Sequence, residues 1–443
     1  MRVFTSGPPI VGTMPRLPSS GRLVALDALR GVAAGIVLVH HVSMTAPGIA
    51  AAYQSTVGVD TGSAGWWSTL TPLKFLVAGP EFVLVFFVLS GFVLVRSPLA
   101  SRTAASGTAA GSANGLATRG YDWVAYYPRR IIRLAIPVVV SVALAAAWIL
   151  LVPRAGIDVG GSWLARQDNP DIGLPNLLGE ASVIGGSGRP DVNPPLWSLT
   201  WEMWFSLLLP ICVLLAAATR RLPALWAAAF LAVSATGYVT GIEPLMYLPA
   251  FGLGALLAAN YESLRTWAAR VAARRGGTAL WIALTALGPA LLVSHWLLRP
   301  QLSGIWGDLT LALRVPGAVL VVAVVALWPP LQRPLSARPL VWLGRVSFSL
   351  YLVHFPVVVA FGTMFGPGRW WLGALVSVPL SLVLAQLMYR WVELPAQRLA
   401  NATGRWASTK AGALPRRGGR QADAAASAAP TARAPENERA LAK

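Results

Sequence analysis

The sequence predicts an all-α polytopic membrane protein with about ten transmembrane helices. Of its 443 residues, 55% are hydrophobic and only 12% are charged, which sets it apart from ordinary soluble domains. A helix that crosses a bilayer needs ~20 predominantly apolar residues. The stretches that meet or approach this length are 23–44, 75–95, 134–152, 196–217, 223–241, 245–259, 278–298, 310–332, 343–364 and 370–391.

Basic residues alternate between the segments that connect these stretches. With a cytoplasmic N-terminus, the segments on the inside hold most of the arginines and those on the outside hold few. This distribution follows the positive-inside rule and places both termini in the cytoplasm. Topology and anionic lipid therefore account for the net charge of +19 better than nucleic acid does. We expect a multi-pass protein of a bacterial plasma membrane.

Composition divides the chain into three parts. Residues 1–22 are rich in Pro, Gly and Ser and lack a secretory h-region, so we expect a disordered cytoplasmic segment and a retained first span. Residues 23–398 form the transmembrane domain. Residues 399–443 are rich in Ala, Arg, Pro and Ser, and we expect a disordered cytoplasmic tail. The longest outer loop, 153–195, is either a lid over a binding site or a mere connection.

Several kinds of chemistry have no support in the sequence. Cys212 is the only cysteine and lies inside a span, so we expect an apolar filler and no cysteine-based metal site. No HExxH, P-loop or GxGxxG motif occurs in a suitable context. We therefore expect no metal, no nucleotide hydrolysis and no dinucleotide cofactor.

The stretch LDALRGVAAGIVLVHH, residues 26–41, carries an aspartate, an arginine and two histidines inside the first span. A charge at mid-bilayer costs at least ~2.5–3.5 kcal/mol, so such groups are usually functional or paired. Arg30 and His41 return to within about 20° of one helix face and lie ~16 Å apart along the axis. Asp27 is one turn before Arg30 and can pair with it. We expect these three to face the bundle interior, whereas His40, about 100° away, need not.

Two carboxylates are predicted at the depth of His41. Glu202 in NPPLWSLTWEMWF and Glu81 in AGPEFVLVFFVLSG each lie near the outer end of a span. A histidine oriented by a carboxylate is a usable general base for a hydroxyl group. We expect His41 to be that base and Glu202 to orient it. The alternative is a polar knot that only fixes helix packing.

A second polar layer is predicted near the cytoplasmic ends of the spans. Ser90, in FFVLSGF, precedes Gly91, which permits close helix approach. The stretch YYPRRIIRLAIP places Arg129, Arg130 and Arg133 at the mouth of the third span, where guanidinium groups suit phosphate. Positive-inside anchoring is the alternative, but the depth of Arg30 favours a phosphate-bearing cytoplasmic donor.

Later spans carry further polar residues. His354, in LGRVSFSLYLVHFP, is predicted near mid-membrane, and Arg314 requires a carboxylate or ligand partner. Glu393, in WVELPAQR, is expected to pair with an arginine at the cytoplasmic mouth. Tryptophans gather at the outer boundaries, mostly as interfacial anchors, although a few could stack on sugar rings. The candidate substrate-binding residues are Glu81, Trp197 and His354.

These motifs together resemble the membrane acyltransferase-3 family. LDALRG followed by His41, with ten residues between Arg30 and that histidine, is similar to the family's signature. FFVLSGF, RRIIRLAIP, LWSLTWE, LGRVSFSLYLVHFP and WVELPAQR follow in the family's order, and the likeness covers about 23–398. The chain departs from the pattern at His40, where an aromatic residue is common, and at Leu84, where an acidic residue is frequent. The soluble esterase-like domain that some relatives carry after the last span is not expected here.

The resemblance implies an O-acyltransferase that moves an acyl group, typically acetyl from acetyl-CoA, onto a hydroxyl of a sugar, cell-envelope glycan, lipid or secondary metabolite. It implies that Arg30 and His41 are essential, that Arg129, Arg130 and Arg133 meet the CoA, and that Glu202 is the family's fourth-span glutamate. The acyl–pantetheine arm is expected to pass Ser90 and Arg30 on its way to His41. Acetyl or a longer acyl group, and direct transfer or an acyl-histidine, all stay open.

A transporter or flippase of acidic or sugar-linked substrates is the rival interpretation, because charges at the membrane midplane suit it equally. Transporters often show internal repeats or paired broken helices, and the sequence shows neither.

Overall fold

The computed structural model describes residues 24–106, 121–152, 162–167, 170–184 and 190–411. Helices make up 86% of this part of the chain, and it contains no strand. Among these residues, eight helices are long and apolar enough to cross a membrane, or nine if one bent pair is a single span. The predicted all-helical, multi-pass architecture is therefore confirmed.

The spans follow the predicted stretches. Eight pass the length and composition test: α1 (Val24–Met44), α4 (Gly79–Ser106), α5 (Trp123–Leu151), α9 (Pro223–Thr240), α12 (Gly277–Leu298), α13 with α14 (Gly304–Ala312, Arg314–Leu327), α16 (Arg338–Phe365), and α17 with α18 (Trp370–Met388, Leu394–Lys410). The other two stretches form the bent pair α7 (Trp197–Leu207) and α8 (Leu209–Ala218), and the shorter α10 (Glu243–Ala259). The connecting helices include α2 (Pro47–Gln54), α3 (Ala64–Thr69), η1 (Pro72–Val77), η2 (Leu164–Gln167), α6 (Leu174–Ser182), η3 (Pro194–Leu196), α11 (Tyr261–Ala272) and α15 (Pro329–Leu335).

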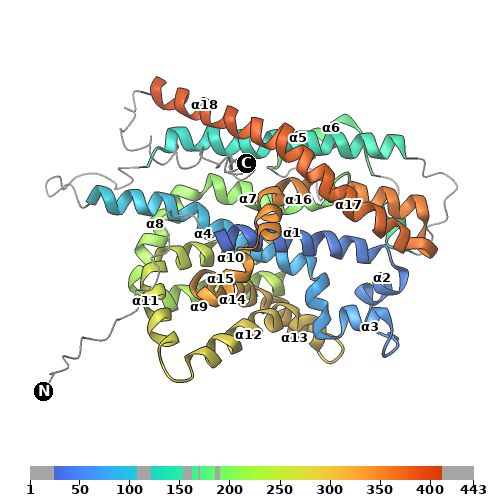
Figure 1. The fold of residues 1–443 in the computed structure, drawn as a ribbon, viewed down its shortest axis with the longest axis horizontal. Helices are drawn as coiled ribbons and strands as arrows, with labels where there is room; N and C mark the ends of the chain where they lie inside the picture. The colour runs from blue at the N-terminus through green and yellow to red at the C-terminus, as the bar shows by residue number, and fades with distance from the viewer. Residues whose placement is uncertain (1–23, 107–120, 153–161, 168–169, 185–189, 412–443) are drawn as a thin grey trace, which may run out of the picture.

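The centre of the molecule is built from α1, α4 and α16, while α5 and α18 run side by side along one edge (Figure 1). Close approach at the centre depends on glycines. A Cβ on Gly31 of α1 would lie 2.4 Å from the backbone nitrogen of Gly344 in α16, and one on Gly91 of α4 would lie 2.1 Å from the carbonyl oxygen of Phe251 in α10. The close packing predicted at Gly91 is confirmed, and these crossings fix the depth at which the polar residues of α1 and α4 meet their neighbours.

The fourth predicted span is broken, with a bend of 67° between α7 and α8. Pro210 lies in the first turn of α8, so it cannot donate to the carbonyl of Ser206 four residues earlier. That carbonyl accepts instead from the Tyr126 hydroxyl at 3.1 Å, and the Leu207 carbonyl accepts from the Tyr127 hydroxyl, also at 3.1 Å. Two tyrosines of α5 thus satisfy the backbone groups that the bend exposes.

The disordered tail was predicted to begin at residue 399, which is too early. Residues 399–410 belong to α18, which continues α17 through a π-helical turn, η6 (Tyr389–Glu393). The helix packs on α5, where Ser408 donates a hydrogen bond to Asp122 and Gly404 lies against the Arg129 side chain. Sequence reasoning missed α18 because it is amphipathic and weakly apolar, so its stability comes from this packing. The segments 1–22 and 412–443 lie outside the described residues.

Candidate functional site

A polar and aromatic cavity of about 820 Å³ opens at the end of α1 that carries His41. Its walls come from α1, from α2 and from the segment that leads into α7. The residues that matter most for its chemistry are His40, His41, Tyr53, Trp163, Arg166 and Asp191. Both adjacent histidines line this one space, whereas the sequence had left the direction of His40 open.

His41 is fixed by two hydrogen bonds at one ring nitrogen. Its Nδ1 lies 3.0 Å from the carbonyl oxygen of Val37 and 3.1 Å from Nε2 of His354. A carbonyl oxygen can only accept, so Nδ1 carries the proton, and in the neutral ring Nε2 carries a lone pair. The ring also packs edge-on against Phe355, with centroids 5.1 Å apart. His41 therefore has the geometry of a general base oriented toward the cavity.

His354 is the orienting partner of His41. Its side chain is only 1% exposed, and its Nδ1 donates to the carbonyl of Leu350 at 3.0 Å. Nε2 is then free to accept the proton shared by Nδ1 of His41. The sequence predicted His354 as a substrate-binding residue, but the structure buries it behind His41, where it contacts the His41 ring and does not line the cavity.

Glu202 lies away from His41, contrary to the prediction that it orients this histidine. Its Oε1 accepts from Nη2 of Arg130 at 2.5 Å and from the Ser90 hydroxyl at 3.4 Å. Nε of Arg130 donates to Ser206 at 2.8 Å, one turn along α7 from Glu202. The prediction that Glu202 shares the depth of His41 was therefore wrong, because Glu202 lies in the cluster around Arg30 at the other end of α1. A guanidinium also attracts a carboxylate more strongly than a neutral imidazole does.

A cluster of charged groups surrounds the Arg130–Glu202 pair at the other end of α1. Arg30 and Arg133 both interact electrostatically with Glu202 and with Glu393. Glu393 is 4% exposed and accepts from Ser349 at 2.7 Å and from Gln397 at 3.1 Å. By residue exposure, Arg133 is exposed and Arg30 is half-buried. Arg30, Arg130, Arg133 and Ser90, predicted to act together, do lie in one cluster.

Arg129 has different surroundings from Arg130 and Arg133. Its side chain packs against Gly404 of α18, and its Nε is buried without a hydrogen-bond partner among the described residues. The three arginines were predicted to act together, but Arg129 points toward the helix that the sequence did not reveal.

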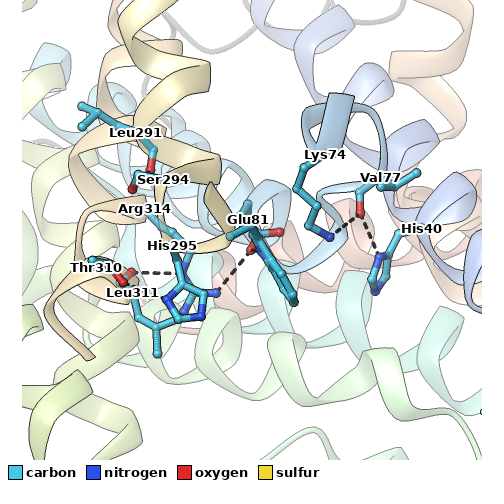
Figure 2. A network of polar contacts seen from close by, with 11 residues as sticks. His40, Lys74, Val77, Glu81, Leu291, Ser294, His295, Thr310, Leu311 and Arg314 are labelled. Carbon is cyan, nitrogen blue, oxygen red and sulfur yellow. Dashed lines mark hydrogen bonds and ion pairs between the residues drawn. The ribbon is translucent and has the colours of Figure 1, made fainter. Parts of the chain in front are cut away.

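Glu81 and Trp197 also lie outside the cavity. Glu81 is fully buried and accepts from Nε1 of Trp296 at 3.0 Å and from Arg314 at 3.4 Å (Figure 2). The predicted carboxylate partner of Arg314 is therefore confirmed and is Glu81. Trp197 packs on Tyr247, with ring centroids 5.1 Å apart, whereas Trp163 lines the cavity with its ring centroid 6.2 Å from that of His41.

The described part of the loop 153–195 forms one rim of the cavity. Glu180 of α6 accepts from the backbone amides of Asp191 and Val192 at 2.8 Å and of Asn193 at 3.1 Å. Burial raises the pKa of Glu180 above its usual range. The side chain of Asn193 donates to the Leu352 carbonyl of α16 at 3.0 Å. Of the two interpretations of the loop, these bonds favour a lid over the candidate site. Arg166 and Asp191, which the sequence did not single out, line the cavity.

Lys74, in η1 outside the spans, is a buried cation beside this site. Its side chain is fully buried, and burial lowers its pKa to about 8. Below that pH the folded protein bears the cost of a buried charge, and between about 8 and 10.5 the unfolded chain binds more protons, so stability rises with pH.

We expect Lys74→Met to raise stability relative to wild type at pH 7, and this gain to shrink above pH 8 by up to ~1.4 kcal/mol per pH unit. Thermal unfolding at pH 7 and pH 10 measures this, and a gain that is constant with pH would contradict it.

Comparison with known families gives one match. The model of a family described as an acyltransferase domain matches residues 23–390. No curated protein and no solved structure matches the chain. In the part of the chain that the structure describes, no group of three or more His, Cys, Asp or Glu side chains could hold a metal ion.

Proposed function

Since the chain belongs to this acyltransferase family, we propose that it transfers an acyl group, with acetyl as the first candidate, from cytoplasmic acyl-CoA to a hydroxyl group of a glycan, lipid or small molecule. The observation that carries the proposal is the His41–His354 pair at the cavity, where Nε2 of His41 has no hydrogen-bond partner among the described residues. Charges at the membrane midplane suit a transporter and an acyltransferase equally, so the family match is what favours acyl transfer over the transporter.

The chemistry begins at the acceptor hydroxyl. Nε2 of His41 takes the hydroxyl proton while the oxygen attacks the thioester carbonyl, and the carbon–sulfur bond breaks to release the CoA thiolate. The imidazolium then gives its proton to that thiolate, so the products are an ester and free CoA. His354 accepts the proton on Nδ1 of His41 in a hydrogen bond, which stabilises the charge that the ring acquires.

The donor would bind at the arginine cluster. Arg30, Arg130 and Arg133 present guanidinium groups that suit the phosphates of CoA, and Glu202 holds Arg130 in place. Arg30 and His41 lie on one face of α1, ~16 Å apart, so an extended pantetheine arm can follow α1 from the phosphates to the base.

The acceptor would bind in the cavity. Tyr53 and Trp163 offer ring faces, while Arg166 and Asp191 offer polar groups. This mixture suits a hydroxyl-rich acceptor such as a sugar.

Two experiments test the activity. Purified protein in nanodiscs receives labelled acetyl-CoA and a bacterial envelope glycan fraction, and mass spectrometry follows a gain of an acyl group. The same analysis of envelope glycans and secreted metabolites from cells with and without the gene identifies the acceptor. Uptake of substrate into vesicles without acylation would instead favour the transporter.

Glu180→Ala tests the role of the outer loop. Without the carboxylate, three backbone amides lose their acceptor and the rim at Asp191 loosens, so the KM for the acceptor should rise about tenfold, equivalent to ~1.4 kcal/mol. The KM for acyl-CoA should not change, because the arginine cluster lies at the other end of α1. Steady-state kinetics with each substrate varied in turn measure both, and equal changes in both constants would contradict a local role.

A further inference from the structure

The imidazole rings of His40 and His41 both line the cavity and make similar hydrogen bonds. Their ring centroids lie 5.1 Å apart, with the planes inclined at 70°. Nδ1 of His40 lies 2.9 Å from the Val77 carbonyl, as Nδ1 of His41 lies 3.0 Å from the Val37 carbonyl. Both Nδ1 atoms therefore carry protons, and each neutral ring has its lone pair on Nε2. Neither Nε2 is hydrogen-bonded within the described residues, and neither is among the buried atoms without a partner.

A buried polar network holds His40 in this form. The Val77 carbonyl that accepts from His40 also accepts from Nζ of Lys74 at 3.2 Å (Figure 2). The ammonium lies over the rings of Tyr53 and Trp296, 4.6 and 4.3 Å from their centroids, and Trp296 in turn donates to Glu81. A second positive charge beside a buried ammonium is costly, so the neutral form of His40 is favoured.

The position of the ring is also fixed. A Cβ on Gly79 would lie 2.6 Å from Cγ of His40, so the glycine at the start of α4 makes room for the imidazole. Tyr53 packs on the opposite side, with ring centroids 5.2 Å apart. So many contacts on a side chain beside the base indicate a role in the site rather than in packing alone.

We propose that His40 binds the acceptor and selects molecules with two neighbouring hydroxyl groups, a vicinal diol such as a sugar ring carries. One hydroxyl gives its proton to Nε2 of His41 and is acylated, while its neighbour donates a hydrogen bond to Nε2 of His40. Lys74 and Glu81 act through His40 as positioning residues. This inference rests on the proposed acyl transfer and adds the acceptor class.

Cyclohexanol and cis-1,2-cyclohexanediol test the selection, because they differ by one neighbouring hydroxyl. With acetyl-CoA as donor, the wild type should show a kcat/KM about tenfold higher for the diol, the value of one well-made hydrogen bond. His40→Phe should bring the ratio between the two alcohols to about one, whatever it does to the absolute rates. The matched control His295→Phe, which alters a histidine bound to Thr310 outside the cavity, should keep the ratio. A wild-type ratio near one, or an unchanged ratio in His40→Phe, overturns the inference.

Nitrogen NMR of the histidines gives a readout that does not depend on turnover. The chain has four histidines, so ¹⁵N-histidine labelling yields few signals, and His40→Phe assigns those of His40. At neutral pH we expect Nδ1 of His40 to be protonated and Nε2 unprotonated, and Lys74→Met to perturb these signals while Arg265→Gln, on exposed α11, does not. A proton on Nε2 of His40 overturns the inference even if neither alcohol is acylated. Failure of acyl transfer to every acceptor, with the expected signals present, counts against the proposed function instead.

Discussion

Replacing His41 with alanine is expected to lower kcat for acyl transfer by about 10²–10⁴-fold, the usual contribution of a general base. The variant should still insert and express, because the ring is half-buried at the cavity and its loss removes no ion pair. The measurement is transfer from labelled acetyl-CoA in nanodiscs. His295→Ala is the matched control, since it removes an imidazole that is bonded to Thr310 and does not line the cavity.

His354→Gln should lower kcat less than His41→Ala does, with little change in the KM for the acceptor, because His354 acts through His41. Two residues that act as one unit are not additive. The double variant His41→Ala, His354→Gln should therefore be about as impaired as His41→Ala alone. If the two losses multiply instead, His354 has a role of its own, and its hydrogen bond to His41 does not contribute to catalysis.

Arg130→Met should have the second large effect, on both stability and donor affinity. It leaves the Glu202 carboxylate, whose side chain is 16% exposed, without its ion-pair partner. Breaking such a pair from one side costs about 3–5 kcal/mol, and we expect the lower end because Arg30 and Arg133 remain near. The Kd for acyl-CoA should rise at least about tenfold with the loss of one charge-assisted contact to phosphate.

A double variant separates these two effects. Arg130→Met with Glu202→Gln removes both charges, so it should recover most of the lost stability in thermal unfolding but none of the donor affinity in calorimetry. Arg265→Gln, which breaks an exposed ion pair with Glu262 on α11, is the control and should change neither. If the double variant binds acyl-CoA with normal affinity, Arg130 has only a structural role and does not contact the donor.

The sequence was a good guide to what its periodicity controls. The lengths of the apolar stretches located ten helical regions. The spacing of Arg30 and His41 put both on one face of α1, with Arg30 in the arginine cluster and His41 at the cavity. The partners of these residues depend on how α1, α5, α7 and α16 are rotated against one another, which no single stretch records. Glu202 meets Arg130 in the cluster around Arg30, and His41 meets His354, so both the depth and the partner predicted for Glu202 were wrong.

Other misses came from local chemistry that has no periodic pattern. Tyr53, Arg166 and Asp191 lie in short helices and loops, and only their three-dimensional arrangement brings them to His41. The break at Pro210 could have been anticipated from the proline, but not the two tyrosine hydroxyls of α5 that make it tolerable.

Because of the π-helical turn at Tyr389–Glu393, the number of residues between α17 and α18 sets how α18 is rotated about its own axis. A π turn holds one more residue than the α-helical path would, so α18 is rotated by about 100° relative to a straight continuation of α17. Removing one of residues 389–392 would restore a regular helix, swing Glu393 away from the arginine cluster and turn the Gly404–Ser408 face away from α5. Substitutions here should consequently be tolerated far better than a one-residue deletion, because the chain length between the last span and α18 sets the alignment of both.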